Sequence, residues 1–225
     1  MSDVIRSTLR GRLSAYFRNK RAATLRRLID QLTCTHNKLT VLDIGGRARY
    51  WEQIGIPFLR ERNVSVTILN LHRSEFTDRD LSDIFTFQVG DARSLSYPDG
   101  HFDLSHSNSV IEHVGGWPDM QEFARETRRI AKSYYVQTPY FWFPVDPHFY
   151  AMPMFHWLPR AARAHILRAV PLAASGRART YEGAVQAVNS SRLLNIAQFR
   201  TLFPDAEIEA ERFARLPKSL IAIRR

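Results

Sequence analysis

The stretch Lys38-Leu-Thr-Val-Leu-Asp-Ile-Gly-Gly46 is a short apolar run that ends on an acidic residue and two glycines. Two later stretches repeat this pattern, Val89-Gly-Asp-Ala92 and Phe102-Asp-Leu-Ser-His-Ser-Asn-Ser-Val-Ile-Glu-His-Val114. Each is typical of a β-strand with a polar tip, and open α/β sheets bind ligands in the crevice at the carboxyl ends of their strands. The three tips therefore predict one nucleotide-like ligand lying across one edge of a sheet.

These three stretches, in this order and spacing, resemble the class I S-adenosylmethionine (SAM)-dependent methyltransferases, and most closely their small-molecule, type 11 branch. The first resembles the SAM motif of that family, the second its adenine-side motif, and the third its fourth strand and following loop. The resemblance covers residues 36–138 well and the C-terminal strands loosely. It implies SAM as the cofactor and methyl transfer as the reaction.

Alternating strand and helix patterns predict an α/β fold with a mostly parallel sheet and right-handed crossovers. With the family resemblance, we expect a Rossmann-like sheet of seven strands, helices on both faces and a C-terminal antiparallel hairpin. The predicted strands are 39–44, 64–69, 84–89, 102–107, 133–137, 206–212 and 219–223. The predicted helices are 3–32, 51–61, 118–131, about 160–170 and 190–203.

A chain of 225 residues, 44% of them hydrophobic, can bury one substantial core, so we expect a single domain. We divide it into a basic N-terminal helix (1–35), a SAM-binding core (36–138), acceptor-side loop and helices (139–205), and C-terminal strands (206–225). Cys34 is the one cysteine, which excludes an internal disulfide. With no long apolar run and no signal-peptide pattern, a cytoplasmic location is expected.

The net charge of +10 is concentrated in part in residues 5–27, where seven arginines and Lys20 lie between apolar residues at near-helical spacing. Such a basic amphipathic helix can lie on an anionic membrane surface. The alternative is that its apolar stripe packs on the domain as a lid over the cofactor. Packing on the protein is the prediction, with weak membrane contact left open. The oligomeric state is not predicted.

The family resemblance also assigns candidate cofactor residues. Asp43 ends the first strand, and Gly45 and Gly46 form the turn that cradles the methionine part of SAM in the family. Arg47 and Arg49 stand where the family's second and third glycines are expected. Arg47 can pair with the SAM carboxylate if its side chain turns inward.

The other strand ends complete this set. Asn70 replaces the acid that usually binds the ribose hydroxyls, and its amide can still accept one hydrogen bond and donate another. Asp91 can accept from the adenine amino group, while the Ala92 backbone amide donates to a ring nitrogen. Ser107 and Asn108 lie in the loop that borders the transferable methyl in the family.

Residues 139–160 break the alternation, with prolines and aromatic residues that exclude a regular helix or central strand. Long ordered loops of this kind are usually functional, and this one offers Asp146 and His148 as orienter and base for an acceptor. His113 is a second candidate base. A hydrophobic plug is the structural alternative. Asp146, His148 and His156 could supply three metal ligands, but no further pattern fixes a geometry, so no metal is predicted.

The sequence therefore predicts a SAM-dependent methyltransferase that acts on an oxygen or nitrogen of a small molecule. The main alternative is a methyltransferase-fold protein that has lost catalysis and serves in binding or assembly, which Arg47, Arg49 and Asn70 would explain. A nicotinamide-dependent enzyme fits less well, because the third glycine of that fingerprint is also missing. The basic helix keeps RNA methylation open, but no RNA-binding signature accompanies it, so a nucleic-acid partner is not expected.

Overall fold

The computed structural model describes residues 2–34, 37–75, 83–149, 152–172 and 176–225, and the side chains of the first helix from residue 15 onward. Seven strands form its sheet: β1 (Leu39–Ile44), β2 (Val64–Asn70), β3 (Phe85–Val89), β4 (Phe102–Asn108), β5 (Ala131–Pro139), β6 (Glu207–Phe213) and β7 (Leu216–Arg224). The α-helices are α1 (Ser2–Thr33), α2 (Ala48–Ile54), α3 (Ile56–Glu61), α4 (Trp117–Arg129), α5 (Arg160–Ala169), α6 (Tyr181–Asn189) and α7 (Ile196–Leu202). Three short 3₁₀ helices are η1 (Arg73–Glu75), η2 (Ile111–His113) and η3 (Phe155–Trp157).

The strand order is β3-β2-β1-β4-β5-β7-β6. The pairs from β3 to β5 are parallel, whereas β7 runs antiparallel to both β5 and β6. This confirms the predicted fold class, including the C-terminal hairpin. From β1 the chain builds outward first to β2 and β3 and then, on the other side, to β4 and β5. That reversal leaves a crevice at the carboxyl ends of β1 and β4, which is where ligands bind in open α/β sheets.

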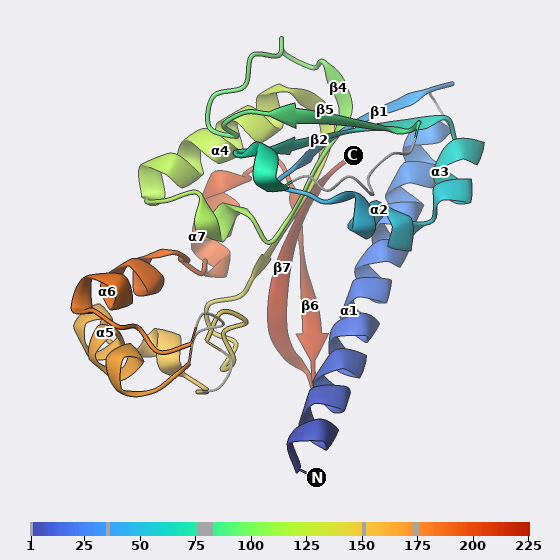
Figure 1. Cartoon of the computed structure of the whole chain (residues 1–225). Coiled ribbons are helices and arrows are strands. Elements are labelled where there is room, and N and C mark those ends of the chain that lie inside the picture. Colours follow the sequence, from blue (N-terminus) through green and yellow to red (C-terminus); the bar gives the residue numbers. More distant parts are fainter. Residues whose placement is uncertain (1, 35–36, 76–82, 150–151, 173–175) are drawn as a thin grey trace.

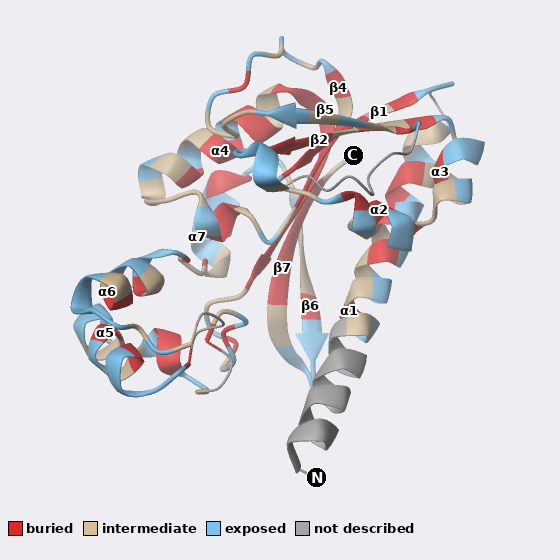
Figure 2. Ribbon diagram, in the orientation of Figure 1, coloured by how far each residue is buried: buried red, intermediate tan, exposed pale blue. Residues whose placement is uncertain are grey.

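Helices cover both faces of the sheet, as predicted (Figure 1). Alternate residues of β1 point to opposite faces, so that Leu42 and Ile44 pack with α4 and α7, while Leu39 and Val41 pack with α1, α2 and α3. Figure 2 shows the central strands as largely buried between these layers. The sheet is therefore a rigid platform that fixes the positions of the strand ends.

Helix α1 packs on the protein over the part whose side chains are described. Leu25 and Ile29 are fully buried in the cluster that contains Trp51, and Phe17 is buried beside the ring of Phe213. Arg21 also pairs with the buried carboxylate of Glu211 at 2.9 Å. The side chains of Arg6, Arg10 and Arg12, on which the membrane hypothesis also depends, lie outside the described part. Among the described helices, none has a stretch long and apolar enough to cross a membrane.

Several predicted boundaries were wrong for local reasons. The single helix expected over 51–61 is two helices, because the chain takes a positive φ of 111° at Gly55 and a new helix begins at Ile56, with Pro57 in its first turn. The helix expected over 190–203 starts only at Ile196, where Asn195 and Gln198 form a reciprocal cap. Helix α6 was not predicted at all.

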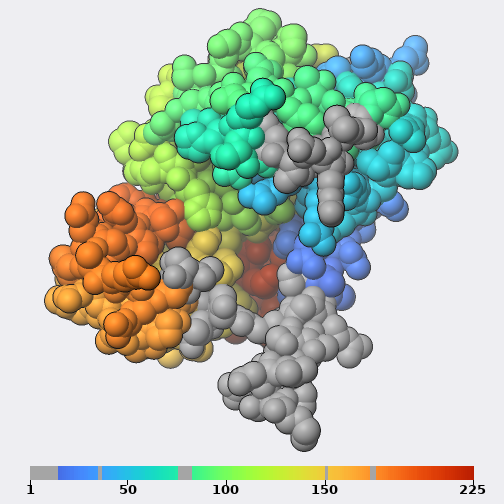
Figure 3. Space-filling view, in the orientation of Figure 1, coloured from blue at the N-terminus to red at the C-terminus, as the bar shows by residue number. Residues whose placement is uncertain are grey.

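Residues 139–160 are irregular, as expected, apart from the end of β5, the short η3 and residues 150–151, which lie outside the described part. The loop does not simply plug the sheet. Phe149 and Phe155 pack instead with α5 and α6 through Leu167 and Val188. Figure 3 shows these two helices as a lobe at one side of the molecule. The acceptor-side segment is thus a small packed unit beside the strand ends.

Candidate functional site

The turn after β1 requires glycine at two successive positions. Gly45 has a φ of 70°, and a Cβ there would lie 2.6 Å from Cγ2 of Val110. A Cβ on Gly46 would overlap the carboxylate of Asp43. The chain can therefore turn tightly here only without side chains, which leaves the backbone exposed to a ligand.

Asp43 supports this turn from below. Its Oδ2 accepts from Nε1 of Trp51 at 2.6 Å, and its Oδ1 lies 2.6 Å from Nδ1 of His106. All three side chains are buried. The predicted residue is thus placed at the site, with its carboxylate engaged inside the protein and holding the glycine turn.

Four predicted cofactor residues line one cavity of about 370 Å³ at the carboxyl ends of β1, β2 and β3. They are Gly45, Asn70, Asp91 and Ala92. This volume lies within the range of small-molecule sites. Asn70 donates from Nδ2 to the carbonyl of Gly46 at 2.9 Å, which joins the ends of β1 and β2. No described side chain of α1 lines the cavity, so that part of the helix is not the lid that was considered.

Asp91 stands at the cavity with its carboxylate clamped by Arg93. The Arg93 guanidinium donates to both carboxylate oxygens, at 2.7 Å from Nη2 and 3.0 Å from Nε, and also pairs with Asp119 at 2.7 Å. The hydrogen bonds from Arg93 hold the pKa of Asp91 below its ordinary value, although burial opposes them. Asp91 is therefore an ionised acceptor, with lone pairs left for a ligand amine.

All but one of the remaining predicted cofactor residues line a second cavity beside the turn. Asp43, Gly46, Arg47 and Asn108 line a smaller cavity of about 260 Å³ that shares Gly45 with the first. The Arg47 side chain points to Glu75, with its Nη2 2.8 Å from the carboxylate in an exposed ion pair. Ser107 is fully buried and lines neither cavity. The predicted cofactor residues are thus divided between two cavities that meet at Gly45.

The three predicted catalytic residues form one hydrogen-bonded chain. Oδ1 of Asp146 accepts from the backbone N–H of His148 at 2.8 Å and lies 2.7 Å from Nδ1 of the same residue. Nε2 of His148 lies 3.0 Å from Nε2 of His113. Nδ1 of His113 lies 2.7 Å from the carbonyl oxygen of Ser190. Because His113 also lines the 370 Å³ cavity, the chain runs from the irregular loop to the candidate cofactor site.

These partners fix the protons on the two rings. A carbonyl oxygen can only accept, so His113 carries its proton on Nδ1 and offers a lone pair at Nε2. His148 must then donate from Nε2 to His113 and from Nδ1 to the carboxylate, which makes it an imidazolium. Burial lowers the pKa of His148, but the hydrogen bond and charge of Asp146 outweigh it and the pKa is raised. Burial and the neighbouring His148 lower the pKa of His113.

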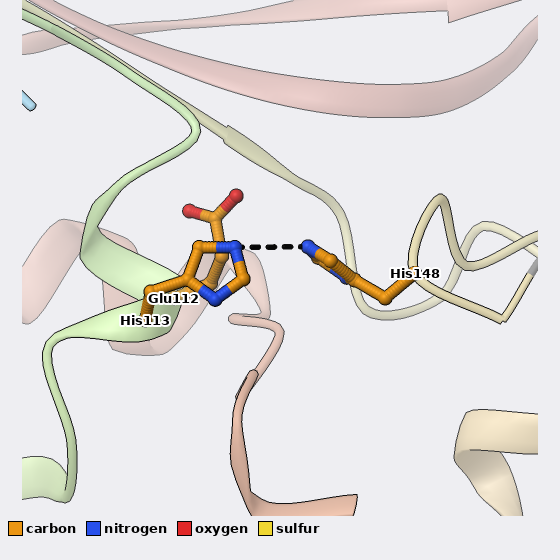
Figure 4. A group of neighbouring side chains, drawn as sticks. All are labelled: Glu112, His113 and His148. Atoms are coloured by element: carbon orange, nitrogen blue, oxygen red, sulfur yellow. Dashed lines mark hydrogen bonds between the residues drawn. The ribbon is translucent and has the colours of Figure 1, made fainter. Parts of the chain in front are cut away.

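Glu112 lies directly beside this pair, although the sequence did not single it out as catalytic. It is buried, and its Oε2 accepts from the Thr138 hydroxyl at 2.9 Å. Burial raises its pKa to about 7, against the hydrogen bonds that lower it. Figure 4 shows Glu112 and His113 on η2 and His148 on the facing loop, with the two rings meeting.

Glu112, His113 and His148 are the group among the described residues that could hold a metal ion, since one ligand atom of each lies within 4.8 Å of the others. This is not the set considered from the sequence, because Nε2 of His156 lies 2.8 Å from the Phe141 carbonyl instead. The two Nε2 atoms that would face an ion are hydrogen-bonded to each other.

A further cavity of about 230 Å³ lies on the far side of the histidine chain. Phe141, Asp146 and His156 of the irregular loop line it, together with residues of α4, α5 and the 191–194 segment. Arg160, Arg163 and Arg192 also line it, and the sequence did not group them because they come together only through the packing of α5 and α6.

Residues 45–134 match a family model described as a methyltransferase domain. The chain is 44% identical over 54 residues to a "Probable tocopherol O-methyltransferase, chloroplastic" of Oryza sativa subsp. japonica, which covers 24% of this chain and 14% of that protein. It is 37% identical over 71 residues to an ajmaline N-methyltransferase of Rauvolfia serpentina, which covers 32% of this chain and 23% of that protein. The chain therefore spans less than a quarter of the length of either relative.

Among solved structures, an O-methyltransferase family protein from Burkholderia thailandensis is similar in fold, with a TM-score of 0.50 and 15% identity. The match covers 92% of this chain and 58% of that one. The family match begins at the glycine turn and includes Asn70, Asp91 and His113. Residues 45–134 therefore match the type 11 methyltransferase domain, and the fold of the chain agrees with that match.

Proposed function

We propose that this protein transfers a methyl group from SAM to an oxygen or nitrogen atom of a small molecule. The observation that carries the proposal is the chain from Asp146 through His148 to His113, which ends at the cavity lined by Gly45, Asn70 and Asp91. A group that accepts protons thus stands beside the candidate cofactor site.

The cavity suits this cofactor, because the glycine turn leaves backbone where side chains would clash. Asn70 would hold the ribose through its amide, and Asp91 and Ala92 the adenine through the carboxylate and a backbone N–H. Arg47 would release Glu75 to meet the cofactor carboxylate, since their exposed ion pair is weak. When bound, SAM supplies a methyl group already activated on a sulfonium, so the protein's main task is alignment.

The protein's own chemical contribution is the removal of a proton from the acceptor. An acceptor group that separates the two Nε2 atoms would meet an imidazole on either side. His148 in its neutral form is the better base, because Asp146 orients its ring and stabilises the imidazolium that results. Turnover should therefore rise with pH as His148 loses its proton, with a midpoint above the ordinary histidine pKa.

Oxygen and nitrogen are favoured over carbon because the two curated relatives are named for transfer to oxygen and to nitrogen. A small molecule is favoured because the acceptor-side cavity has a volume of about 230 Å³ and is lined in part by Trp117, Met120 and Phe141. A cytoplasmic location, a single domain over 1–225 and weak contact of α1 with anionic membranes stay predictions.

The test is formation of S-adenosylhomocysteine from SAM by the full chain, with a panel of small aromatic alcohols, amines and acids. We expect turnover with some members of the panel, and its loss in His148→Ala. Tight SAM binding without turnover on any member, or with the same slow background in His148→Ala, would favour a fold that has lost catalysis.

A further inference from the structure

Three arginines face the 230 Å³ cavity on the acceptor side of the histidine chain. Arg160 and Arg163 are three residues apart on α5 and so lie on the same face of that helix. Arg192 comes from the segment between α6 and α7, and its backbone N–H donates to the carbonyl of Glu112 at 2.7 Å. The cavity therefore gathers positive charge from two separate segments.

These guanidinium groups have no ion pair or side-chain hydrogen bond with any residue in the part of the chain that the structure describes. The Nε atoms of Arg163 and Arg192 are buried and without a partner there. Several other arginines are paired with acids, as Arg93 is with Asp91 and Asp119. Buried donors without acceptors destabilise a protein, so their persistence here calls for a ligand that accepts hydrogen bonds.

The charges that line the cavity also favour a ligand that accepts hydrogen bonds. Burial and the charge of nearby Arg160 lower the pKa of Arg163, which shows like charges held together. Asp146 is the carboxylate that lines the cavity, and its Oδ1 is already engaged by the ring and backbone of His148. The three arginines thus outnumber the single lining carboxylate, which is already hydrogen-bonded to His148.

We propose that this cavity binds the acidic group, a carboxylate or a phosphate, of the methyl acceptor. Arginine presents a planar fork of donors that matches both kinds of acid. Trp117, Met120 and Phe141 would cover the apolar body of the same molecule. The inference rests on the proposed function, because it names the substrate class of that enzyme as small organic acids.

The acid is the anchor of the acceptor and not the methylated group. The arginine cavity and the candidate cofactor cavity share no lining residue. Asp146 lines the first and His113 the second, with His148 joining them. An acceptor held by its acid at the arginines would therefore extend its hydroxyl or amine toward the histidines.

The test is a titration of the full chain by calorimetry at fixed ionic strength, with benzoate and phenyl phosphate as the acids and benzamide as their neutral counterpart. We expect one acid to bind saturably and benzamide to bind far more weakly. Arg163→Gln and Arg192→Gln should each weaken binding of the acid about tenfold or more. Arg168→Gln is the matched control, because that residue lies exposed on the same helix and lines no part of the cavity.

Equal binding of benzoate and benzamide would overturn the proposal, as would unchanged binding in Arg163→Gln and Arg192→Gln. Equal losses in Arg168→Gln would do the same, because they indicate a response to net charge alone. Arg163→Lys keeps the charge and separates loss of the fork from loss of folding, and it should bind between wild type and Arg163→Gln. S-adenosylhomocysteine is titrated into the same variants. Failure of that binding alone rejects the proposed function, whereas failure of the acids alone rejects only the arginine site.

Discussion

The two sides of the candidate site are built in different ways. On the cofactor side, Gly45, Asn70 and Asp91 each stand at the end of one parallel strand, and all lie within the matched residues 45–134. On the acceptor side, Asp146 and Arg192 lie outside that match, in segments without regular structure. We therefore propose that the sheet supplies the cofactor platform, while the segments after the match add the residues that would select and activate the acceptor.

The largest expected effect falls on the acceptor side. His148→Ala should lower turnover by about 10²–10⁴-fold, because it removes the proposed base, while leaving the affinity for S-adenosylhomocysteine unchanged. Single-turnover rates and calorimetry on the same protein measure both. His165→Ala, an exposed histidine on α5, is the control and should change neither. A stable and fully active His148→Ala protein would move the role of base to His113.

Glu112→Gln should change how stability depends on pH. Since the pKa of Glu112 is raised to about 7, the folded protein holds that proton more tightly than the unfolded chain. The wild type therefore loses stability as the pH rises from about 4.5 to 7, and the neutral variant is spared that loss. The gain of the variant over wild type should grow by up to about 3 kcal/mol across this range. Urea unfolding at pH 4.5 and 7.5 measures it, and a constant difference would contradict it.

A smaller effect is expected on the cofactor side. Asp91→Ala should weaken binding of S-adenosylhomocysteine by about 1–3 kcal/mol, because the adenine amine loses its charged acceptor. Asp99→Ala is the control, since Asp99 pairs with Arg129 at the surface, away from the cavity. If both variants bind S-adenosylhomocysteine as the wild type does, Asp91 forms only its ion pair with Arg93 and does not contact the cofactor.

The smallest effect should come from Arg47→Ala. Its ion pair with Glu75 is exposed, so the loss of unfolding free energy should stay within about 1 kcal/mol. Thermal unfolding checks this part. Calorimetry on the same variant shows whether Arg47 turns inward, because only then does the affinity for the cofactor fall as well. Unchanged affinity would leave Arg47 as a surface residue.

Most of the fold and much of the cofactor side could be predicted from the sequence, because residues that are close together in the chain determine both. A strand, a polar tip and a glycine turn are adjacent in the chain at Asp43 and Gly45, and parallel strands bring such tips to one edge. On this side of the site, the sequence could not predict which side chains contact one another. The clamp of Arg93 on Asp91, and the burial of Asp43 between Trp51 and His106, depend on side chains that meet only in the folded protein.

The acceptor side was predictable only in part. Asp146 and His148 could be paired because only Pro147 separates them, but the link to His113 spans 35 positions. Helix α6 escaped prediction since it is a short segment that contains Gly183 and is stabilised by packing against α5. Without α6, nothing in the sequence places Arg192 beside Arg163. Long-range packing therefore decides this part of the site.

Calorimetric titration of the full chain with S-adenosylhomocysteine tests the central claim most directly, with Gly45→Val measured beside it. A Cβ at residue 45 would be strained and would meet Val110, so the variant removes the turn that opens the cavity. We predict saturable binding of one molecule by the wild type and its loss in Gly45→Val, with folding checked by circular dichroism. Absence of binding by the folded wild type, or equal binding by Gly45→Val, would contradict a cofactor site at the ends of β1, β2 and β3.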